Sequence, residues 1–178
     1  GSLRINLDDA EAARRILTAF LRAGCRKLAF ANSEAGTPSL MAREAGFRAA
    51  AKDMGIEITV ARHGLTGYEA GRILAQRLLT MAERPDAVFC ATDLIACGFM
   101  DAARHQFSLS IPGQLCVAGF DNIEQASWTA YNLTTFAQPV EDIAREAAAW
   151  LSGGAPDNGR QHVKLHAELV WRSSIRGG

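Results

Sequence analysis

The sequence predicts an α/β fold in which helices connect the strands of a parallel sheet. Segments with apolar residues at helical spacing alternate along the chain with short apolar segments of strand length. The segment 87–91 (Ala-Val-Phe-Cys-Ala) is apolar throughout, as strands of a parallel sheet are when both of their faces are buried. The chain has 178 residues, 48% of them apolar, which is enough for a globular core.

Local signals mark where the helices begin. Asp8 is a helix cap followed at the third helical position by Glu11, and Pro38 suits the first position of the next helix. Thr66 and Glu69 form the pattern of a capping box for a third helix. We expect helices over 9–23, 38–54, 67–81, 93–105 and 139–151, strands over 27–31, 57–61, 87–91, within 114–120 and over 163–171, and a turn-rich loop over 155–159.

Composition excludes several classes of protein. The 19 basic and 19 acidic residues give a net charge of 0, which argues against a large surface for nucleic acid or anionic membranes. No apolar run has the length of a transmembrane helix, so we expect no membrane contact. The four cysteines lack a C-x-x-C pair, so we expect reduced thiols in a cytoplasmic protein.

Signatures of catalysis are also missing from the sequence. It contains no G-x-S-x-G elbow, H-E-x-x-H motif, phosphate-binding loop or G-x-G-x-x-G fingerprint. The four histidines do not cluster with acidic residues at the spacing of metal ligands. We therefore expect a protein that is not an enzyme and that has no catalytic residue, no metal site and no cofactor.

One carboxylate stands where ligands bind in α/β proteins. Residues 114–120 read as a buried strand that ends in Gly-Phe, and Asp121 follows directly. Ligands of open parallel sheets bind beyond the carboxyl ends of the strands. Asp121 is therefore a candidate ligand-binding residue, the alternative being a carboxylate that only shapes a turn or caps a helix.

Three segments in this order resemble the effector-binding domain of the LacI/GalR family of transcription regulators. They are S-I-P-G-Q-L-C-V-A-G-F-D-N at 110–122, L-T-T-F-A-Q-P at 133–139 and E-L-V-W-R-S-S at 168–174. Two more segments are similar to family motifs, R-E-A-G-F at 43–47 and T-D-L-I-A-C-G at 92–98. The resemblance implies one Rossmann-like lobe of a type I periplasmic-binding-protein-like fold, with the other lobe largely missing.

The resemblance implies a set of ligand contacts. Arg43 matches an arginine that binds effector oxygens, with a solvated surface arginine as the alternative, and Asp121 matches the family's carboxylate. Gln138 matches a polar position at the hinge between the lobes. Thr92 stands where the family often has Asn, next to an Asp93 suited to capping the helix. Thr66 stands where an aromatic residue usually stacks on the ligand, which leaves the ligand class open.

The resemblance also implies a homodimer. In the family, the regions that match the helix after residue 93 and the segment 123–131 form part of the interface between protomers. Met100, Ile123 and Trp128 are the candidate interface residues, and the alternative for these regions is that they close the core.

The resemblance divides the chain into three parts and implies its partners. Residues 5–135 match the C-terminal lobe, 136–160 the hinge and a helix of the N-terminal lobe, and 161–174 a strand that returns to the C-terminal lobe. The implied protein binds a small molecule, a sugar or sugar derivative, between two lobes. It controls operator DNA through an N-terminal helix-turn-helix absent from this chain.

Two further expectations depend on this division. With half of the cleft missing, we expect weak ligand binding and a rearranged or partnered helix at 139–151.

The alternative function is a periplasmic solute-binding protein of an ABC transporter, which shares the two-lobed fold.

Overall fold

The structure, a computed structural model, describes residues 1–154 and 160–177, so the loop expected over 155–159 lies outside the described residues. Its centre is a four-stranded parallel sheet in the order β3-β2-β4-β5. These strands are β2 (Leu28–Asn32), β3 (Ile58–Arg62), β4 (Ala87–Cys90) and β5 (Cys116–Ala118). The parallel α/β architecture predicted from the sequence is confirmed.

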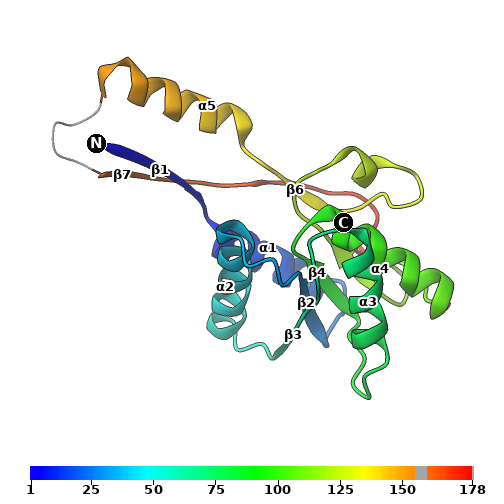
Figure 1. Cartoon of the computed structure of the whole chain (residues 1–178). Helices are drawn as coiled ribbons and strands as arrows, with labels where there is room; N and C mark the ends of the chain where they lie inside the picture. The colour runs from blue at the N-terminus through cyan, green and yellow to red at the C-terminus, as the bar shows by residue number, and fades with distance from the viewer. Residues whose placement is uncertain (155–159, 178) are drawn as a thin grey trace.

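Two pairs of helices enclose this sheet, as Figure 1 shows. The helix α1 packs against α2, and α3 packs against α4 on the other side of the sheet. The four helices are α1 (Asp9–Arg22), α2 (Pro38–Asp53), α3 (Tyr68–Leu79) and α4 (Asp93–Gln106). All residues of β2 and β4 are buried, because helices cover both faces of these central strands.

The sheet continues past β5 through a short strand that comes later in the chain. Residues of β6 (Thr135–Ala137) pair with β8 (Glu168–Val170), and Thr134 and Ala137 form parallel bridges to the end of β5 and to Asp121. A 3₁₀ helix, Glu124–Ser127, lies in the connection from β5 to β6. The backbone N–H of Asp121 donates to the Phe136 carbonyl over 2.8 Å, so β6 fixes the loop in which Asp121 lies.

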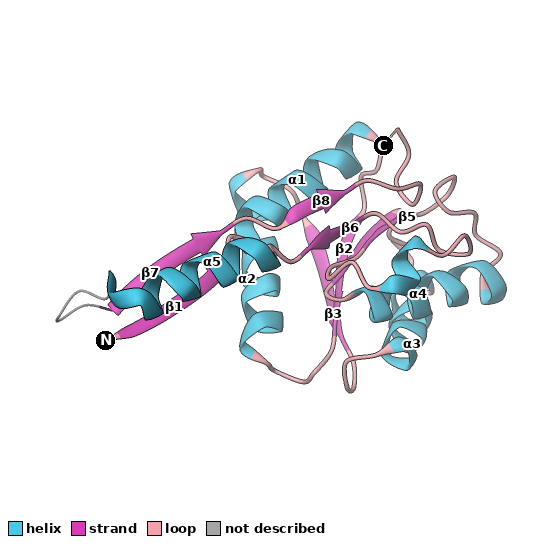
Figure 2. Cartoon of the chain, turned by 90° about the horizontal axis from the view of Figure 1, so that it is seen from above, coloured by secondary structure: helices cyan, strands magenta, loops and turns pink. Residues whose placement is uncertain are grey.

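A second, separate strand pair extends away from the sheet. Strand β1 (Ser2–Leu7) pairs in parallel with β7 (Arg160–Leu165), and α5 (Val140–Ala149) runs alongside this ribbon, as Figure 2 shows. The expected strand over 163–171 is thus divided between the ribbon and β8. Its predicted alternation of apolar and exposed side chains holds as far as Leu169, whereas Trp171 is 47% exposed.

The helix α5 packs on the β1–β7 ribbon of its own chain, which covers part of its apolar surface. Ile143, Ala147 and Trp150 are half-buried, whereas Val140 and Leu151 are 67% and 75% exposed. A short π-helical turn, Trp150–Gly154, follows the helix. The apolar stripe that the sequence predicts for this helix is therefore only partly covered by the β1–β7 ribbon. The division of the chain into lobes stays a prediction.

Aromatic side chains connect the sheet to its helices in the core. Phe30 lies 5.0 Å from Phe47 and 5.6 Å from Phe89, measured between ring centroids. The row continues from Phe89 to Phe136 over 6.2 Å and from Phe136 to Phe120 over 5.4 Å. Buried aromatic pairs at these distances add about 0.5–1.5 kcal/mol each to the free energy of unfolding beyond the area they bury.

Two expected helix caps are wrong. Thr66 does not cap α3: the cap position is Gly67, and the Thr66 hydroxyl lies 2.6 Å from the Ser33 hydroxyl instead. Asp93 does not cap α4 either, because Thr92 is the cap and its hydroxyl accepts from the Ile95 N–H over 3.3 Å. The Asp8 cap of α1 is confirmed, with Asp8 accepting from the Glu11 N–H.

Candidate functional site

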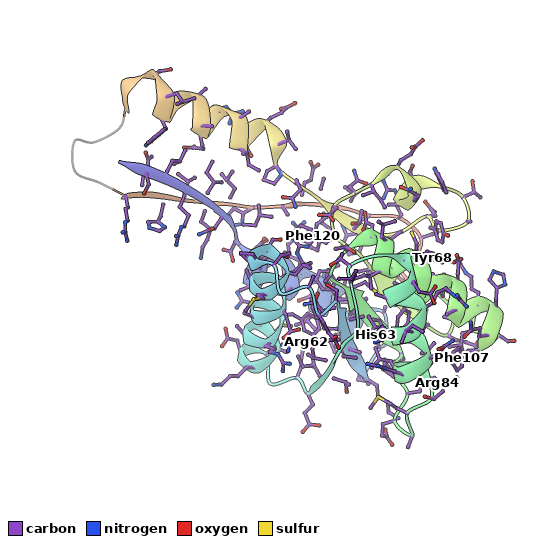
Figure 3. The ribbon with its side chains drawn as sticks, in the orientation of Figure 1. Arg62, His63, Tyr68, Arg84, Phe107 and Phe120 are labelled. Atoms are coloured by element: carbon purple, nitrogen blue, oxygen red, sulfur yellow. The ribbon has the colours of Figure 1, made fainter. Side chains whose placement is uncertain are left out.

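The candidate site lies at the carboxyl edge of the sheet and centres on Arg43. This side chain is 4% exposed, and its guanidinium carbon lies 3.6 Å from the centroid of the Phe120 ring. Its Nη1 donates to the Ala91 carbonyl, just beyond β4, over 2.6 Å. Figure 3 shows Phe120 at the edge of the sheet nearest the β1–β7 ribbon. The planar guanidinium is thus held between an aromatic face and a strand end.

Three carboxylates act on this arginine. Asp9 Oδ1 lies 3.7 Å from Arg43 Nε, and the charges of Asp121 and Asp93 also favour the charged guanidinium. Burial lowers the pKa of Arg43, and the three carboxylates oppose that shift. We call Arg43, Asp9, Asp93 and Asp121 the Arg43 cluster.

Burial also acts on the carboxylates of the Arg43 cluster. It raises the pKa of Asp9, Asp93 and Asp121 above the usual value, and Arg43 partly offsets the shift at Asp9 and Asp121. At Asp93 two hydrogen bonds partly offset this rise in pKa. The hydroxyl of Thr135 and the backbone N–H of Ile123 donate to the carboxylate over 2.6 and 2.9 Å. One buried cation therefore faces more carboxylate charge than it can neutralise.

Two atoms of the Arg43 cluster have no hydrogen-bond partner among the described residues. Arg43 Nε and Asp9 Oδ1 are both buried, and the 3.7 Å between them is too long for a hydrogen bond. Unsatisfied buried polar atoms are rare because each costs about 1–3 kcal/mol of stability. A donor and an acceptor side by side suit a hydroxyl group of a ligand, which can accept from one and donate to the other.

The residues that carry this donor and acceptor line a hollow of about 820 Å³. Asp9 and Arg43 lie on its wall together with Gln138 and with Ile143 of α5. Gln138 Nε2 donates to Asp121 Oδ1 over 3.3 Å, which links the hinge position to the cluster. The structure therefore brings together Arg43, Asp121 and Gln138, which are distant in sequence.

Asp121 is held in an unusual backbone conformation. Its φ is 119°, followed by 56° at Asn122, and side-chain-bearing residues rarely adopt such positive values. The Asn122 side chain accepts from Arg172 over 2.8 Å, and Arg172 also donates to the Leu133 carbonyl over 2.9 Å. Strain of this kind costs about 1–3 kcal/mol and persists where the surrounding structure enforces it.

The hydroxyl groups of Thr92 and Thr66 have partners outside the Arg43 cluster. Thr92 is 9% exposed, with its hydroxyl used as the cap of α4. Thr66 is exposed and lies beside Ser33, at the end of β2. Ser33 lines a different hollow of about 480 Å³, whose wall includes Glu44 and Arg62. Arg62, labelled in Figure 3, donates to Glu44 and lowers the pKa of that carboxyl group.

The expected interface residues differ in exposure. Met100 is fully buried in its own core, so the expectation that Met100 contacts a partner is wrong: α4 turns this side chain inward against α3 and the sheet. Ile123 is half-buried and Trp128 is 48% exposed. Leu94 and Tyr68 are also exposed. Tyr68 of α3, labelled in Figure 3, donates to Asp101 of α4.

Sequence reasoning missed Asp9 and the role of the C-terminal motif. Asp9 reads as the first residue of a helix, and only the fold brings it to Arg43. Ser174 accepts from the Thr134 N–H over 2.8 Å and donates to the Val117 carbonyl over 2.6 Å, so it joins β5 to the start of β6. The family resemblance gave the positions of this motif but not its contacts.

Among the described residues, no helix is both long and apolar enough to cross a membrane. Over the same part of the chain, no group of three or more His, Cys, Asp or Glu side chains is arranged to hold a metal ion.

Comparison with known proteins gives consistent matches. Residues 17–175 match the family of periplasmic binding protein-like domains. The "HTH-type transcriptional repressor CytR" of Escherichia coli is 32% identical over 97% of this chain and 51% of its own length. The "HTH-type transcriptional repressor PurR" of Vibrio atlanticus is 27% identical over 96% of this chain and 52% of its own length. The chain thus spans about half the length of the curated relatives it matches.

Solved structures match at the level of the fold. A protein from Actinobacillus succinogenes described as uncharacterized has a TM-score of 0.84 at 27% identity, over 97% of this chain and 64% of its own. A LacI transcriptional regulator from a Rhodococcus species has a TM-score of 0.83 at 24% identity, over 98% of this chain and 69% of its own. A LacI family regulator from Enterococcus faecium, solved with bound ribose, has a TM-score of 0.78 at 22% identity, over 96% of this chain and 64% of its own.

Proposed function

Since this chain belongs to the family of periplasmic binding protein-like domains, we propose that it is the effector-sensing part of a LacI/GalR-type transcription regulator. Its curated relatives are named as helix-turn-helix repressors. In this proposal a small molecule binds at the Arg43 cluster, between this lobe and a second lobe. A helix-turn-helix segment outside this chain reads operator DNA in the cytoplasm.

The observation that carries the proposal is that Arg43 and Asp9, whose buried Nε and Oδ1 atoms lack partners, both line the 820 Å³ hollow. A hydroxylated ligand such as a sugar satisfies both atoms. Asp121, held by β6 and aligned by Gln138, accepts from another ligand hydroxyl. One regulator with this fold was solved with ribose and one, from an Arthrobacter species, with lactose.

Burial makes this site selective. The cation and the carboxylates of the Arg43 cluster are already desolvated, so they gain hydrogen bonds without losing many water contacts. An apolar ligand would leave Arg43 Nε unsatisfied, whereas a polyol would not. The site therefore favours ligands with adjacent hydroxyl groups.

Effector control requires two states of the whole protein. Ligand that contacts both lobes favours the closed arrangement, and closure shifts the dimer between forms that bind operator DNA differently. In the homodimer, the exposed Trp128 and Leu94 lie on the surface that meets the second copy. The backbone N–H of Ile123 donates to Asp93 of the Arg43 cluster over 2.9 Å, and in this proposal that bond links the site to the dimer surface.

A periplasmic solute-binding protein is the second candidate, because it shares this domain family. The curated relatives described above are named as repressors, which favours the regulator. The upstream sequence of the gene separates the two candidates: a helix-turn-helix supports the regulator, and a secretory signal supports the transporter component.

A thermal-shift screen tests the proposed ligand class. Pentoses, hexoses and their acids, with ribose and lactose included, are added to the full-length protein. We expect at least one of them to raise the melting temperature, since ligand that binds only the folded state stabilises it. A panel that leaves the melting temperature unchanged would contradict a sugar ligand.

The variant Asp121→Asn then assigns the site. It keeps the size of the side chain and tolerates the positive φ, but it removes the charged acceptor. We expect the affinity for the ligand to fall by about tenfold to a hundredfold, as for loss of a charged hydrogen bond. The matched control is Asp53→Asn, an exposed residue at the end of α2, which leaves the affinity unchanged.

A further inference from the structure

Two buried cysteines outside the candidate site lie together at the opposite end of β5 from Asp121. Cys25 belongs to the turn between α1 and β2, and Cys116 is the first residue of β5. Both are fully buried. They are 91 positions apart in sequence, so only the fold brings them together.

Shared neighbours place the two cysteines side by side. The Cys25 thiol donates to the Asp86 carbonyl over 3.5 Å, and the backbone N–H of Cys116 donates to the same oxygen over 3.0 Å. The Cys116 thiol donates to the Pro112 carbonyl over 3.8 Å. Arg176 Nη1 donates to that same carbonyl over 2.6 Å, while its Nη2 lies 3.2 Å from the Cys25 sulfur.

Arg176 supplies positive charge beside the two sulfur atoms. The hydrogen-bond acceptors of its guanidinium are the carbonyls of Ala23, Pro112 and Gly113 and the Cys25 sulfur. Among the described residues no carboxylate pairs with it, so its charge is free to stabilise a thiolate. The contact with Cys116 and burial raise the pKa of Cys25, whereas the contact with Cys25 and the nearby Arg176 lower the pKa of Cys116.

The Arg176 side chain connects the Cys25 sulfur to an open hollow. Arg176 is half-buried and forms part of the wall of an open hollow of about 440 Å³ between α1 and the C-terminal segment. Its side chain is therefore the layer between solvent and the Cys25 sulfur. Cys90 and Cys97 have no such neighbour: burial raises the pKa of both, and the nearby Asp93 raises each further.

We propose that Cys25 and Cys116 are a redox-sensitive pair that peroxides convert reversibly into a disulfide, with Arg176 as the residue that activates it. The thiolate of one cysteine attacks one oxygen of hydrogen peroxide, the O–O bond breaks, and the leaving hydroxide takes a proton to form water. The thiol of the other cysteine then attacks the sulfur of the resulting sulfenic acid. The S–S bond forms, the S–O bond breaks, and the hydroxide leaves as water with the proton of that thiol.

The disulfide has a consequence for the candidate site. It joins the start of β5 to the turn that follows α1 and removes the thiolate beside Arg176. The same C-terminal segment holds Ser174, which bonds to β5 through Val117 and to Thr134 before β6. Oxidation therefore acts on the two strands that position Asp121.

Peptide mapping of the folded protein tests the proposal directly. The chain is treated with graded hydrogen peroxide, its remaining thiols are alkylated in denaturant, and the digest is analysed by mass spectrometry. We expect a Cys25–Cys116 linked peptide, two fewer alkylated thiols, and full recovery with dithiothreitol. Oxidation confined to Cys90 and Cys97, or a link that forms only after unfolding, would overturn the proposal.

Variants identify the activating residue. Arg176→Leu is expected to slow formation of the link at least tenfold at neutral pH, because the thiolate loses its cation. Arg22 lines the same hollow without touching either sulfur, so Arg22→Leu is the matched control and is expected to leave the rate unchanged. Cys97→Ser also leaves the rate unchanged, and a thermal melt confirms that each variant is folded. Equal rates for Arg176→Leu and the parent protein would refute the role of Arg176.

Discussion

At the scale of single residues, Arg43 is the buried cation that offsets the charge of the carboxylates in the Arg43 cluster. Its charge lowers the pKa of Asp9 and Asp121, and the charges of Asp9, Asp93 and Asp121 keep it protonated. Removing it leaves buried carboxylates without a counter-charge, which costs far more than removing a surface arginine.

Replacement of this cation is therefore expected to be costly. We predict that Arg43→Met lowers the free energy of unfolding by about 3–5 kcal/mol at pH 7. Chemical denaturation with urea measures the change. The control is Arg48→Met on the same helix, an exposed side chain whose partner Glu44 keeps Arg62; it is expected to change the free energy by less than about 1 kcal/mol.

The same variant has a distinctive pH dependence. The pKa of Asp9, Asp93 and Asp121 is already raised in the folded state, and loss of Arg43 raises it further at Asp9 and Asp121. A carboxyl whose folded pKa exceeds its unfolded pKa favours folding when protonated, and that contribution is lost as the pH rises through the folded pKa. We predict a smaller deficit for Arg43→Met at pH 5 than at pH 7. Equal deficits at both pH values would contradict the account.

At the scale of elements, two glycines set how closely α3 and α4 pack. A Cβ built on Gly71 would lie 2.0 Å from the Ile95 carbonyl oxygen, and one on Gly98 would lie 1.9 Å from the Tyr68 carbonyl oxygen. Both clashes are with backbone, so neither is relieved by a side-chain rotation. The helices must separate to admit a methyl group.

This close packing gives a prediction with a control in the same helix. Gly71→Ala is expected to lower the free energy of unfolding by about 1–3 kcal/mol or more, the cost of forcing a methyl group into a packed contact. At Gly67, the cap of this helix, a Cβ meets nothing within 4 Å, so Gly67→Ala is expected to cost less, only the preference of a cap position for glycine over alanine. Thermal or urea unfolding distinguishes them, and similar stability of the two variants would argue against the packing described.

The elements also show how far sequence reasoning reaches. The apolar run at 87–91 and the Asp8 cap depend on neighbours within a few residues, and the structure confirms both. The supposed cap at Thr66 fails because its hydroxyl has a better partner in Ser33, which is 33 positions away. Contacts between residues so far apart in sequence, such as Asp9 with Arg43, depend on which strands pair. The local spacing of residues carries no information about strand pairing.

Strand pairing explains another difference. The alternating segment 163–171 predicts one strand, yet the structure pairs its first part with β1 and its last part with β6. Alternation reports which side chains face inward but not which partner a strand chooses. The same limit applied to Met100, whose exposure depends on how α4 is oriented against α3 rather than on its residue type.

At the scale of the whole molecule, exposed apolar side chains on α4 and just after the 3₁₀ helix predict association. Trp128 and Leu94 are 48% and 41% exposed, and tryptophan is enriched among the residues that dominate interface energies. We predict that Trp128→Glu converts the proposed homodimer to monomers in sedimentation experiments. Met41→Glu, which changes an exposed methionine on α2, leaves the dimer intact. An unaltered dimer with Trp128→Glu would place the interface elsewhere.

The central claim is that the Arg43 cluster binds the effector through the atoms that lack partners. The most direct test is a crystal structure of the full-length protein with the sugar that the thermal-shift screen identifies. We predict a ligand hydroxyl within hydrogen-bond distance of both Arg43 Nε and Asp9 Oδ1, with Asp121 accepting from a second hydroxyl. A ligand bound elsewhere, with those two atoms still unpartnered, would contradict the claim.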